Sequence, residues 1–263
     1  MRIFNGKRKA DEIVSELKKK IKKLKTKPAL AVISVGSDPA SKLFVRNKKR
    51  VAREIGIKVI HYKFKTKVKE KTLLEKIEKL NANGAVSSII VQLPLPRRLN
   101  ANKVINRINL KKDVDGFRKK SSFSSPLISS ILIALKDSTS NLKKKKIITL
   151  VNSDIFGRTL EVSLKKEGIK TSYLKSKKSL RIKSVADVLI TVLGRPGFIK
   201  GGMIKDRVVL IDAGITVMGK NKVVGDVNRK SVASKASFLT PVPGGIGPIN
   251  VALLLKNVYL SCK

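Results

Sequence analysis

ALAVISVG, at residues 29–36, is the stretch of this chain that decides its fold class. It is a nearly continuous apolar run, and strands of this kind occur in parallel sheets that are covered on both faces. On either side of this stretch, the spacing of apolar residues predicts a helix capped by Asp11 and a second helix over residues 40–55. IKVIHYKF, at 57–64, predicts the next strand. This alternation is typical of an α/β protein.

The same alternation continues along the rest of the chain. The further predicted elements are helices over 71–80 and 156–166, and strands within VSSIIVQLPLP (86–96), KIITLVN (146–152), DVLITVLG (187–194) and VVLIDAG (208–214). Strands that alternate with helices predict mostly parallel sheets. A lysine-rich stretch at 137–146 interrupts the pattern and predicts a boundary between two lobes.

The charge balance is strongly basic. The chain has 59 lysines and arginines against 18 acidic residues, a formal net charge of +41. A basic nucleic-acid-binding protein is therefore one alternative. The lysines are spread along the chain, however, aromatic residues make up only 4% of it, and it contains no motif that reads RNA or DNA. We expect salt-sensitive, nonspecific attraction to polyanions and no specific nucleic-acid partner.

Three features of the sequence bear on location and metal chemistry. No window of about 18 uninterrupted apolar residues exists, so we expect no membrane span. The N-terminus lacks the apolar core of a signal peptide. The single cysteine, Cys262, can form neither an internal disulfide nor a cysteine-based metal site. We therefore expect a cytoplasmic protein without a metal centre.

The predicted helix at 40–55 contains a candidate proton-transfer group. Phe44 and Lys48 are four residues apart and share one helix face, where an aromatic ring beside an amine suits a flat substrate. Positive neighbours and partial burial lower the pKa of a lysine and let it exchange protons near neutral pH. From the spacing alone, a solvated basic helix face is the favoured interpretation.

The only histidine, His61, alternates with apolar residues along a predicted strand and is expected to lie on the surface. Because the chain has no second histidine, a Ser-His-Asp or Cys-His arrangement is not expected. Acid–base chemistry therefore falls to lysine, carboxylate or tyrosine.

A loop dense in proline and glycine precedes an apolar run near the C-terminus, in TPVPGGIGPINVALLLKN (240–257). Prolines fix φ, and glycines adopt conformations closed to other residues, so this loop is shaped and rigid. Three more unusual segments come before it: VGSDPASKLFVRNKK (35–49), VQLPLP (91–96) and KDVDGF (112–117). The four together, in this order, resemble the bifunctional methylenetetrahydrofolate dehydrogenase/methenyltetrahydrofolate cyclohydrolase family over nearly the whole chain.

The resemblance implies roles for three residues of the first lobe. Lys48 falls on the position of the family's proton-transfer lysine in its Tyr-x-x-x-Lys pattern, and this reverses the preference for a solvated face. Phe44 stands where the family has tyrosine, so the stacking ring is kept and the hydroxyl is lost. Gln92 matches the glutamine that hydrogen-bonds and orients the lysine.

Four further residues match the family's folate-binding positions. Pro94 matches a residue that lines the folate pocket. Asp115 matches the carboxylate that binds the pterin ring, whose N–H groups present two donors on one edge. Taken alone, its turn would be an ordinary solvated one. Gly244 and Gly245 match the loop that closes over the folate, where glycine lets the backbone approach the ligand.

The resemblance is weaker in the second lobe. Val151 replaces the first glycine of the family's Gly-x-Ser-x-x-x-Gly-x-Pro loop, and we expect it to hinder close approach of the cofactor phosphates. Asn152 lacks the positive charge often found at its position, whereas Ser153 is kept. Ser176 belongs to a degraded His-Ser element, and Ile215 matches a nicotinamide contact. These residues are the predicted NADP site.

The resemblance implies two α/β lobes with a cleft between them. The folate-binding catalytic domain is expected at 1–136, with a C-terminal helix at about 248–263 packed back on it, and the Rossmann-like NADP-binding domain at 137–247. The implied reactions are NADP-dependent oxidation of 5,10-methylenetetrahydrofolate to the methenyl form and its hydrolysis to 10-formyltetrahydrofolate, by a homodimer in one-carbon metabolism. A cyclohydrolase with weak or lost dehydrogenase activity is the alternative among enzymes.

Overall fold

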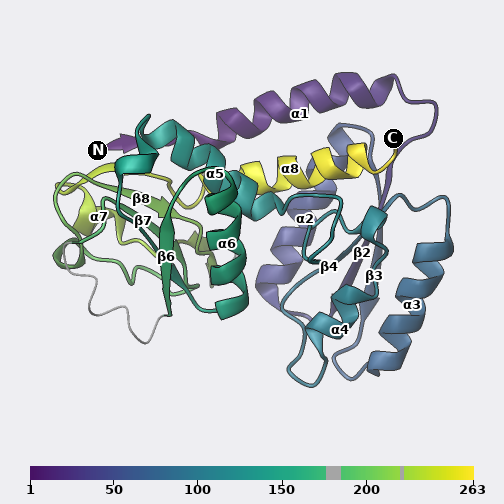
Figure 1. The fold of residues 1–263 in the computed structure, drawn as a ribbon. Helices are drawn as coiled ribbons and strands as arrows, with labels where there is room; N and C mark the ends of the chain where they lie inside the picture. The colour runs from purple at the N-terminus through teal and green to yellow at the C-terminus, as the bar shows by residue number, and fades with distance from the viewer. Residues whose placement is uncertain (176–184, 220–221) are drawn as a thin grey trace. The chain divides into compact units, whose positions relative to one another are not determined.

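The computed structural model describes residues 1–175, 185–219 and 222–263, which form two compact units (Figure 1). Unit 1 contains Met1–Lys9 and Leu127–Asn250, and unit 2 contains Ala10–Pro126 and Val251–Lys263. The chain thus passes from unit 2 to unit 1 earlier than the boundary expected at residue 136. The lysine-rich stretch at 137–146 lies inside unit 1, where it runs from the end of a helix to the start of a strand.

Unit 2 is built on a small parallel sheet. Its elements are β2 (Ala29–Val35), β3 (Lys58–Phe64) and β4 (Ser88–Val91), with α2 (Pro39–Glu54), α3 (Glu70–Ala82), α4 (Ala101–Asn106) and a short 3-10 helix (Leu110–Lys112). In the described part of the chain the strand order is β3-β2-β4, all parallel. The central strand β2 is buried along almost its whole length, which confirms the parallel strand predicted from ALAVISVG.

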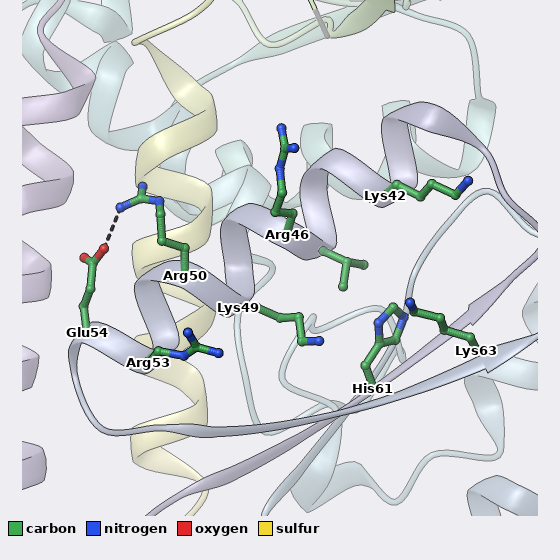
Figure 2. Close-up of a pocket in the computed structure, with 9 residues that line it drawn as sticks. Lys42, Arg46, Lys49, Arg50, Arg53, Glu54, His61 and Lys63 are labelled. Carbon is green, nitrogen blue, oxygen red and sulfur yellow. Dashed lines mark hydrogen bonds and ion pairs between the residues drawn. The ribbon is translucent and has the colours of Figure 1, made fainter. Parts of the chain in front are cut away.

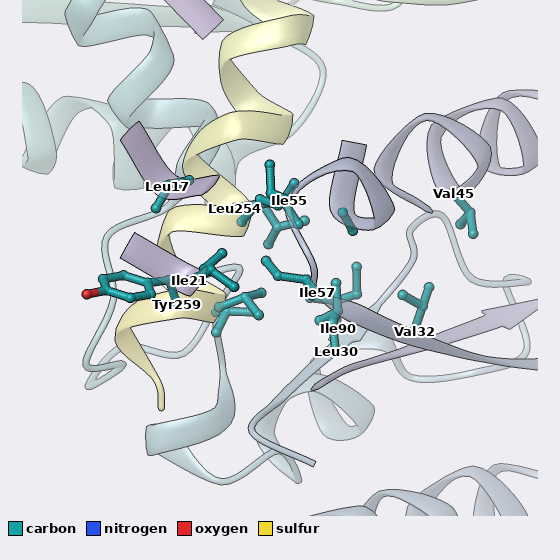
Figure 3. Close-up of a cluster of buried hydrophobic side chains, with 14 residues drawn as sticks. Leu17, Ile21, Leu30, Val32, Val45, Ile55, Ile57, Ile90, Leu254 and Tyr259 are labelled. Carbon is teal, nitrogen blue, oxygen red and sulfur yellow. The ribbon is translucent and has the colours of Figure 1, made fainter. Parts of the chain in front are cut away.

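The two faces of β2 belong to different clusters of buried apolar side chains. Leu30 and Val32 face a cluster that includes side chains of α1 (Gly6–Lys22) and α8 (Ile246–Leu260), as Figure 3 shows. Ala31 and Ile33 face the opposite cluster, which includes side chains of α3. Burial on both faces is the reason that the strand lacks polar alternation.

The first helix begins earlier than predicted. It starts at Gly6, and the side chain of Asn5 accepts a hydrogen bond from the backbone amide of Arg8 over 3.0 Å. The prediction that Asp11 caps this helix is therefore wrong, and Asp11 lies exposed within it. Asn5 satisfies the free amides of the first turn as well as an aspartate would, so the helix extends to it.

The described residues of unit 1 form a six-stranded parallel sheet in the order β1-β11-β8-β7-β5-β6. Its strands are β1 (Arg2–Ile3), β5 (Ile147–Val151), β6 (Thr171–Lys175), β7 (Val188–Val192), β8 (Val208–Asp212) and β11 (Ala236–Leu239). The other elements are α5 (Pro126–Ser138), α6 (Asp154–Lys166), α7 (Arg229–Val232), the antiparallel pair β9 (Thr216–Met218) and β10 (Lys222–Val224), and short 3-10 helices at Leu142–Lys144 and Gly201–Met203. The predicted α/β class, with mostly parallel sheets, is confirmed. Across the described residues, no helix combines the length and the apolar composition needed to cross a membrane.

Candidate functional site

Lys48 and Gln92 meet in unit 2. Lys48 lies on α2, and Gln92 directly follows β4. The Nζ atom of Lys48 donates a hydrogen bond to Oε1 of Gln92 over 3.1 Å. The Gln92 amide is held in this orientation because its Nε2 atom donates to the carbonyl oxygen of Leu93 over 2.8 Å. The structure therefore brings together the two residues for which a catalytic role was predicted.

On both Lys48 and Asp115, burial and the charge of the other residue shift the pKa in opposite directions. Burial lowers the pKa of the Lys48 amine, and the negative charge of Asp115 opposes this effect. Burial raises the pKa of the Asp115 carboxyl, while the charge of Lys48 lowers it and that of Asp113 raises it. An amine whose pKa is lowered is more often neutral near neutral pH, and the neutral form is the one that accepts a proton.

The turn that carries Asp115 is not an ordinary solvated turn. Its neighbour Asp113 is only 1% exposed. One carboxylate oxygen of Asp113, Oδ2, accepts a hydrogen bond from the backbone amide of Arg118 over 2.9 Å. The other, Oδ1, is buried and has no hydrogen-bond partner among the described residues. A buried carboxylate at its base fixes the turn and therefore the position of Asp115.

The same turn is held by a residue whose role the sequence analysis missed. Asn257 of α8 donates hydrogen bonds from Nδ2 to the carbonyl oxygens of Val114, over 2.8 Å, and Ser124, over 3.0 Å. It is a polar residue in a mostly apolar helical run, and this was the available signal. α8 therefore contributes to the shape of the loop around Asp115.

His61 is half-buried, so it is less exposed than the strand pattern predicted. Its Nε2 atom lies 2.8 Å from Oγ of Ser34 on β2. Burial, and then the charges of two nearby lysines, lower the pKa of His61. His61, Ser34 and Gln92 line one cavity of about 110 Å³ together with residues of α2. The helix covers this face of β3, although the strand pattern alone made the face look open.

Two more predicted folate-site residues, Phe44 and Pro94, lie in unit 2. Phe44 is close to Lys48 in sequence, and Pro94 follows the same strand as Gln92. Phe44 is half-buried, one helical turn before Lys48 on α2. The start of this helix is well defined, because Asp38 accepts a hydrogen bond from the amide of Ser41 over 2.7 Å and a proline follows the cap. Pro94 is exposed in the segment after β4.

Gly244 and Gly245 lie in unit 1, in the loop before α8. Gly244 has a φ of 102° and open space where a side chain would be. A Cβ atom on Gly245 would lie 2.5 Å from the carbonyl oxygen of Pro241, so packing within the loop itself requires this glycine. The carbonyl oxygen of Gly244 accepts a hydrogen bond from the amide of Lys7 over 3.1 Å. Only Gly244 therefore leaves room for the approach of a ligand.

The strand order of unit 1 identifies where a nucleotide fits. The strand β5 lies between β6, which follows it in sequence, and β7, which comes next, so the order of strands reverses there. Open α/β sheets bind ligands outside the carboxyl ends of their strands at such a reversal. At this point Nδ2 of Asn152 donates to the carbonyl oxygen of Leu193 over 3.2 Å, linking the ends of β5 and β7.

Two predicted cofactor residues at the end of β5 have different surroundings. Ser153 caps α6, and its hydroxyl accepts from the amide of Phe156 at 3.5 Å. Val151 is fully buried as the last residue of β5, so its side chain belongs to the packing of the sheet. The glycine kept at position 157 also has a packing role, because a Cβ atom there would lie 2.5 Å from the ring of Tyr173. This close packing of helix on strand is one of the functions of glycine in nucleotide-binding folds.

The other cofactor candidates are only partly placed. Ile215 is half-buried in the short loop between β8 and β9, directly before β9. Ser176 lies outside the described residues. Lys175, at the end of β6, forms an ion pair with Asp154 in the first turn of α6. A basic side chain at the end of this strand suits a 2′-phosphate, whereas an acidic one there would suit a free ribose hydroxyl.

A pair of buried carboxylates, Asp212 and Asp226, holds the loops that follow β7 and β10. The sequence patterns did not indicate this pair. Asp212 is 2% exposed and Asp226 is fully buried. The oxygens of Asp212 accept hydrogen bonds from the amides of Asp226, over 3.1 Å, and Val227, over 2.9 Å. Those of Asp226 accept from the amides of Leu193 and Arg195, each over 2.7 Å. Burial raises the pKa of Asp212 to about 7.

Family models match both parts of the chain. Residues 4–115 match the catalytic domain of tetrahydrofolate dehydrogenase/cyclohydrolase, and residues 126–263 match its NAD(P)-binding domain. In sequence, the chain is 39% identical to the bifunctional protein FolD of Agathobacter rectalis, over 99% of each chain. It is 38% identical to that of Rickettsia bellii, over 99% of this chain and 98% of the relative.

Solved structures give the same result. The bifunctional enzyme FolD of Campylobacter jejuni superposes with a TM-score of 0.89 at 34% identity, over 99% of this chain and 98% of that one. The methylenetetrahydrofolate dehydrogenase-cyclohydrolase of Trypanosoma brucei, solved with NADP cofactor and inhibitor, gives a TM-score of 0.88 at 26% identity, over 98% and 96% of the two chains. Sequence, domain models and fold agree along the whole length, and the chain therefore belongs to the tetrahydrofolate dehydrogenase/cyclohydrolase family.

Proposed function

We propose that this chain oxidises 5,10-methylenetetrahydrofolate to 5,10-methenyltetrahydrofolate with NADP and then hydrolyses the methenyl compound to 10-formyltetrahydrofolate. Membership of the family supports both activities. The observation that carries the second is the hydrogen bond between Lys48 and Gln92, in which an amine of lowered pKa is held by an oriented amide.

The hydrolysis needs one group that first accepts and then donates a proton. Water adds to the methenyl carbon, and neutral Lys48 takes the proton that the water loses. The added hydroxyl then loses its proton to solvent and becomes the formyl carbonyl as the bond between this carbon and the pterin-ring nitrogen breaks. Lys48 returns its proton to that nitrogen. The product keeps the formyl group on the other nitrogen, and one proton is released to solvent overall. Gln92 orients the amine, and Asp115 is proposed to bind the pterin ring.

The oxidation needs no acid–base side chain comparable to Lys48. Holding the folate substrate and the nicotinamide ring face to face supplies much of the rate enhancement. NADP, when bound, takes up the hydride that leaves the methylene carbon. The reversal of strand order at β5, the amides of the first turn of α6 and the basic Lys175 fit this cofactor. We propose Asn152, Ser153 and Ile215 as residues that hold it, and unit 1 as the cofactor lobe.

Unit 2 is proposed as the folate-binding lobe, with Phe44 as a stacking ring and Pro94 as part of the pocket wall. Gly244 is proposed by itself as a point where backbone approaches a ligand. We also propose a cytoplasmic homodimer that has no specific nucleic-acid partner. Light scattering after size exclusion tests the dimer, because a mass of about one chain would contradict it.

A spectral assay tests the two activities separately. The purified protein is mixed with 5,10-methylenetetrahydrofolate and NADP, and NADPH and the methenyl absorbance are followed. In a second assay, methenyltetrahydrofolate alone is supplied and its decay is compared with the uncatalysed rate. We expect acceleration in both. Decay without NADPH formation would leave only the cyclohydrolase, and no acceleration in either assay would refute the proposal.

A further inference from the structure

One buried carboxylate of unit 2 lacks the partners that such a group usually has. Asp113 is 1% exposed, and its Oδ1 atom is the only buried side-chain polar atom in the described part of the chain without a hydrogen-bond partner. Its Oδ2 atom accepts one hydrogen bond, from the backbone amide of Arg118 over 2.9 Å. Burying a charged carboxylate without full pairing costs stability, so Asp113 needs an explanation other than stability.

The cationic side chains nearest to Asp113 in sequence bind other groups. The Arg118 guanidinium donates to the carbonyl oxygen of Ile108. The Lys112 ammonium donates to three carbonyl oxygens at the C-terminal end of α3, over 2.8, 2.9 and 3.0 Å. Apart from Lys48, the cations of α2 line a groove of about 550 Å³, shown in Figure 2, to which Asp113 does not contribute. Among the described residues, no ion pair therefore balances the charge of Asp113.

The backbone holds Asp113 in place without help from Oδ1. It forms a parallel bridge with Ile89 of β4. Its carbonyl oxygen accepts hydrogen bonds from the amide of Gly116, over 3.1 Å, and from the hydroxyl of Ser121, over 2.9 Å. The position of the turn that carries Asp115 thus does not depend on the unpartnered oxygen.

The group on which this charge acts is Asp115, two residues later in the same turn. Burial raises the pKa of the Asp115 carboxyl, the positive charge of Lys48 on α2 lowers it, and the negative charge of Asp113 raises it. From α8, the neutral Asn257 contacts this turn. Like charges that are close together disfavour the ionisation of each other. Without the charge of Asp113, Asp115 would therefore ionise at a lower pH.

We propose that Asp113 is a positioning residue for the pterin ring that acts through Asp115: its buried charge opposes ionisation of that carboxyl and so sets the acid limit of folate binding. The inference rests on the proposed function, in which ionised Asp115 accepts two N–H groups of the pterin. Below the limit the Asp115 carboxyl is protonated, and one of its oxygens becomes a donor that faces the donors of the pterin edge. A purely structural Asp113 would leave this limit unchanged.

An NMR titration tests the relation between the two carboxylates. Aspartate carboxyl carbons are labelled with carbon-13, and the Asp115 signal is identified by its absence in Asp115→Asn. We expect Asp115 to titrate above the ordinary value of 3.8 in the parent and at lower pH in Asp113→Asn. The control Asp11→Asn removes a charge from an exposed position on α1 and should keep the parent's midpoint.

Thermal unfolding separates the charge of Asp113 from a structural role. Asparagine can keep the bond to the Arg118 amide, and a neutral amide costs less to bury than an unpaired charge. Asp113→Asn should therefore be at least as stable as the parent near neutral pH. A variant that is less stable, or that fails to fold, would show that Oδ1 supports the structure and would overturn the proposal.

Folate binding is measured by calorimetry over pH with 5-formyltetrahydrofolate, which the two proposed reactions do not consume. In Asp113→Asn the acid limb of the affinity should move to lower pH together with the Asp115 midpoint, and the affinities at the alkaline end should agree. An unchanged midpoint, an equal shift in Asp11→Asn or a loss of affinity at every pH would refute the role of Asp113. Absence of binding in every form would refute the proposed pterin site, and the NMR titration then decides the relation between the carboxylates by itself.

Discussion

The Nζ atom of Lys48 donates a hydrogen bond of 3.1 Å to Oε1 of Gln92, although the two residues lie 44 positions apart. One sits on a helix and the other at the end of a parallel strand, so the pair depends on the packing of α2 against the sheet. The oriented amide leaves the amine one fixed acceptor and frees its remaining positions for a substrate or water.

Replacing Lys48 by methionine should abolish the cyclohydrolase activity with little effect on the fold. A positioned acid–base group contributes about 10²- to 10⁴-fold to a rate, and methionine keeps the length of the side chain without its amine. The decay of methenyltetrahydrofolate measures the loss. Lys19→Met, at an exposed position of α1, is the control and should retain the parent's rate. A Lys48 variant as fast as the parent would remove the lysine from the mechanism.

The pH profile of the hydrolysis should reflect the neutral form of Lys48. Because burial lowers the pKa of this amine, the rising limb of kcat/KM should lie below the ordinary lysine value of 10.5. The negative charge of Asp115 raises the pKa of Lys48, so Asp115→Asn should move the limb to still lower pH. A shift to higher pH in this variant would show that the two groups do not interact in this way.

Asp115→Ala should weaken folate binding more than it affects stability. The carboxylate is proposed to accept two N–H groups of the pterin, and a hydrogen bond to a charged group is worth about 1.5–3 kcal/mol. Calorimetry with a folate substrate measures the affinity, and thermal unfolding measures the stability. Asn257→Ala is the comparison: it removes the two bonds that hold the loop, and we expect a smaller loss of affinity. Unchanged affinity in Asp115→Ala would refute the pterin role.

Val151→Gly should destabilise the protein and should not improve the cofactor site. Val151 is fully buried in β5, so the change removes apolar contacts and adds backbone freedom, together about 2–4 kcal/mol. Urea unfolding and an NADP titration, each at low and high salt, check both parts. Tighter NADP binding in the variant would mean that the valine does obstruct the phosphates, as the sequence pattern predicted.

The contribution of Asp212 to the stability of the protein should fall as pH rises from about 4 to 7. The folded-state pKa of Asp212 is about 7, above the ordinary value of 3.8, so the folded form holds a proton that the unfolded form releases across this range. One such group gives a slope of at most about 1.4 kcal/mol per pH unit. Asp212→Asn should flatten the slope. It should also cost about 1–3 kcal/mol, because its NH₂ group faces backbone amides. Parallel pH–stability curves for parent and variant would contradict this.

The elements were largely predictable because their signals are local. ALAVISVG forms β2, and the predicted helix at 40–55 is α2, within one residue at each end. Lys48 and Phe44 could be placed on one helix from their spacing, since helical periodicity depends on neighbours in sequence. The N-cap of α1 was predicted at the wrong residue, and the reason is also local. Asn5 provides an equally good cap six residues earlier than Asp11.

The α/β class, most of the strands and helices, and the motifs that identify the family follow from local sequence patterns. Which side chains are buried, and which of them meet, depends on tertiary packing. It covered His61 with α2, joined Lys48 to Gln92, attached Asn257 to the loop of Asp115 and placed Val151 inside the sheet. Each of these relations joins segments far apart in sequence, or depends on what packs over a strand. Burial and pKa follow from such contacts, and periodicity in one segment carries no information about them.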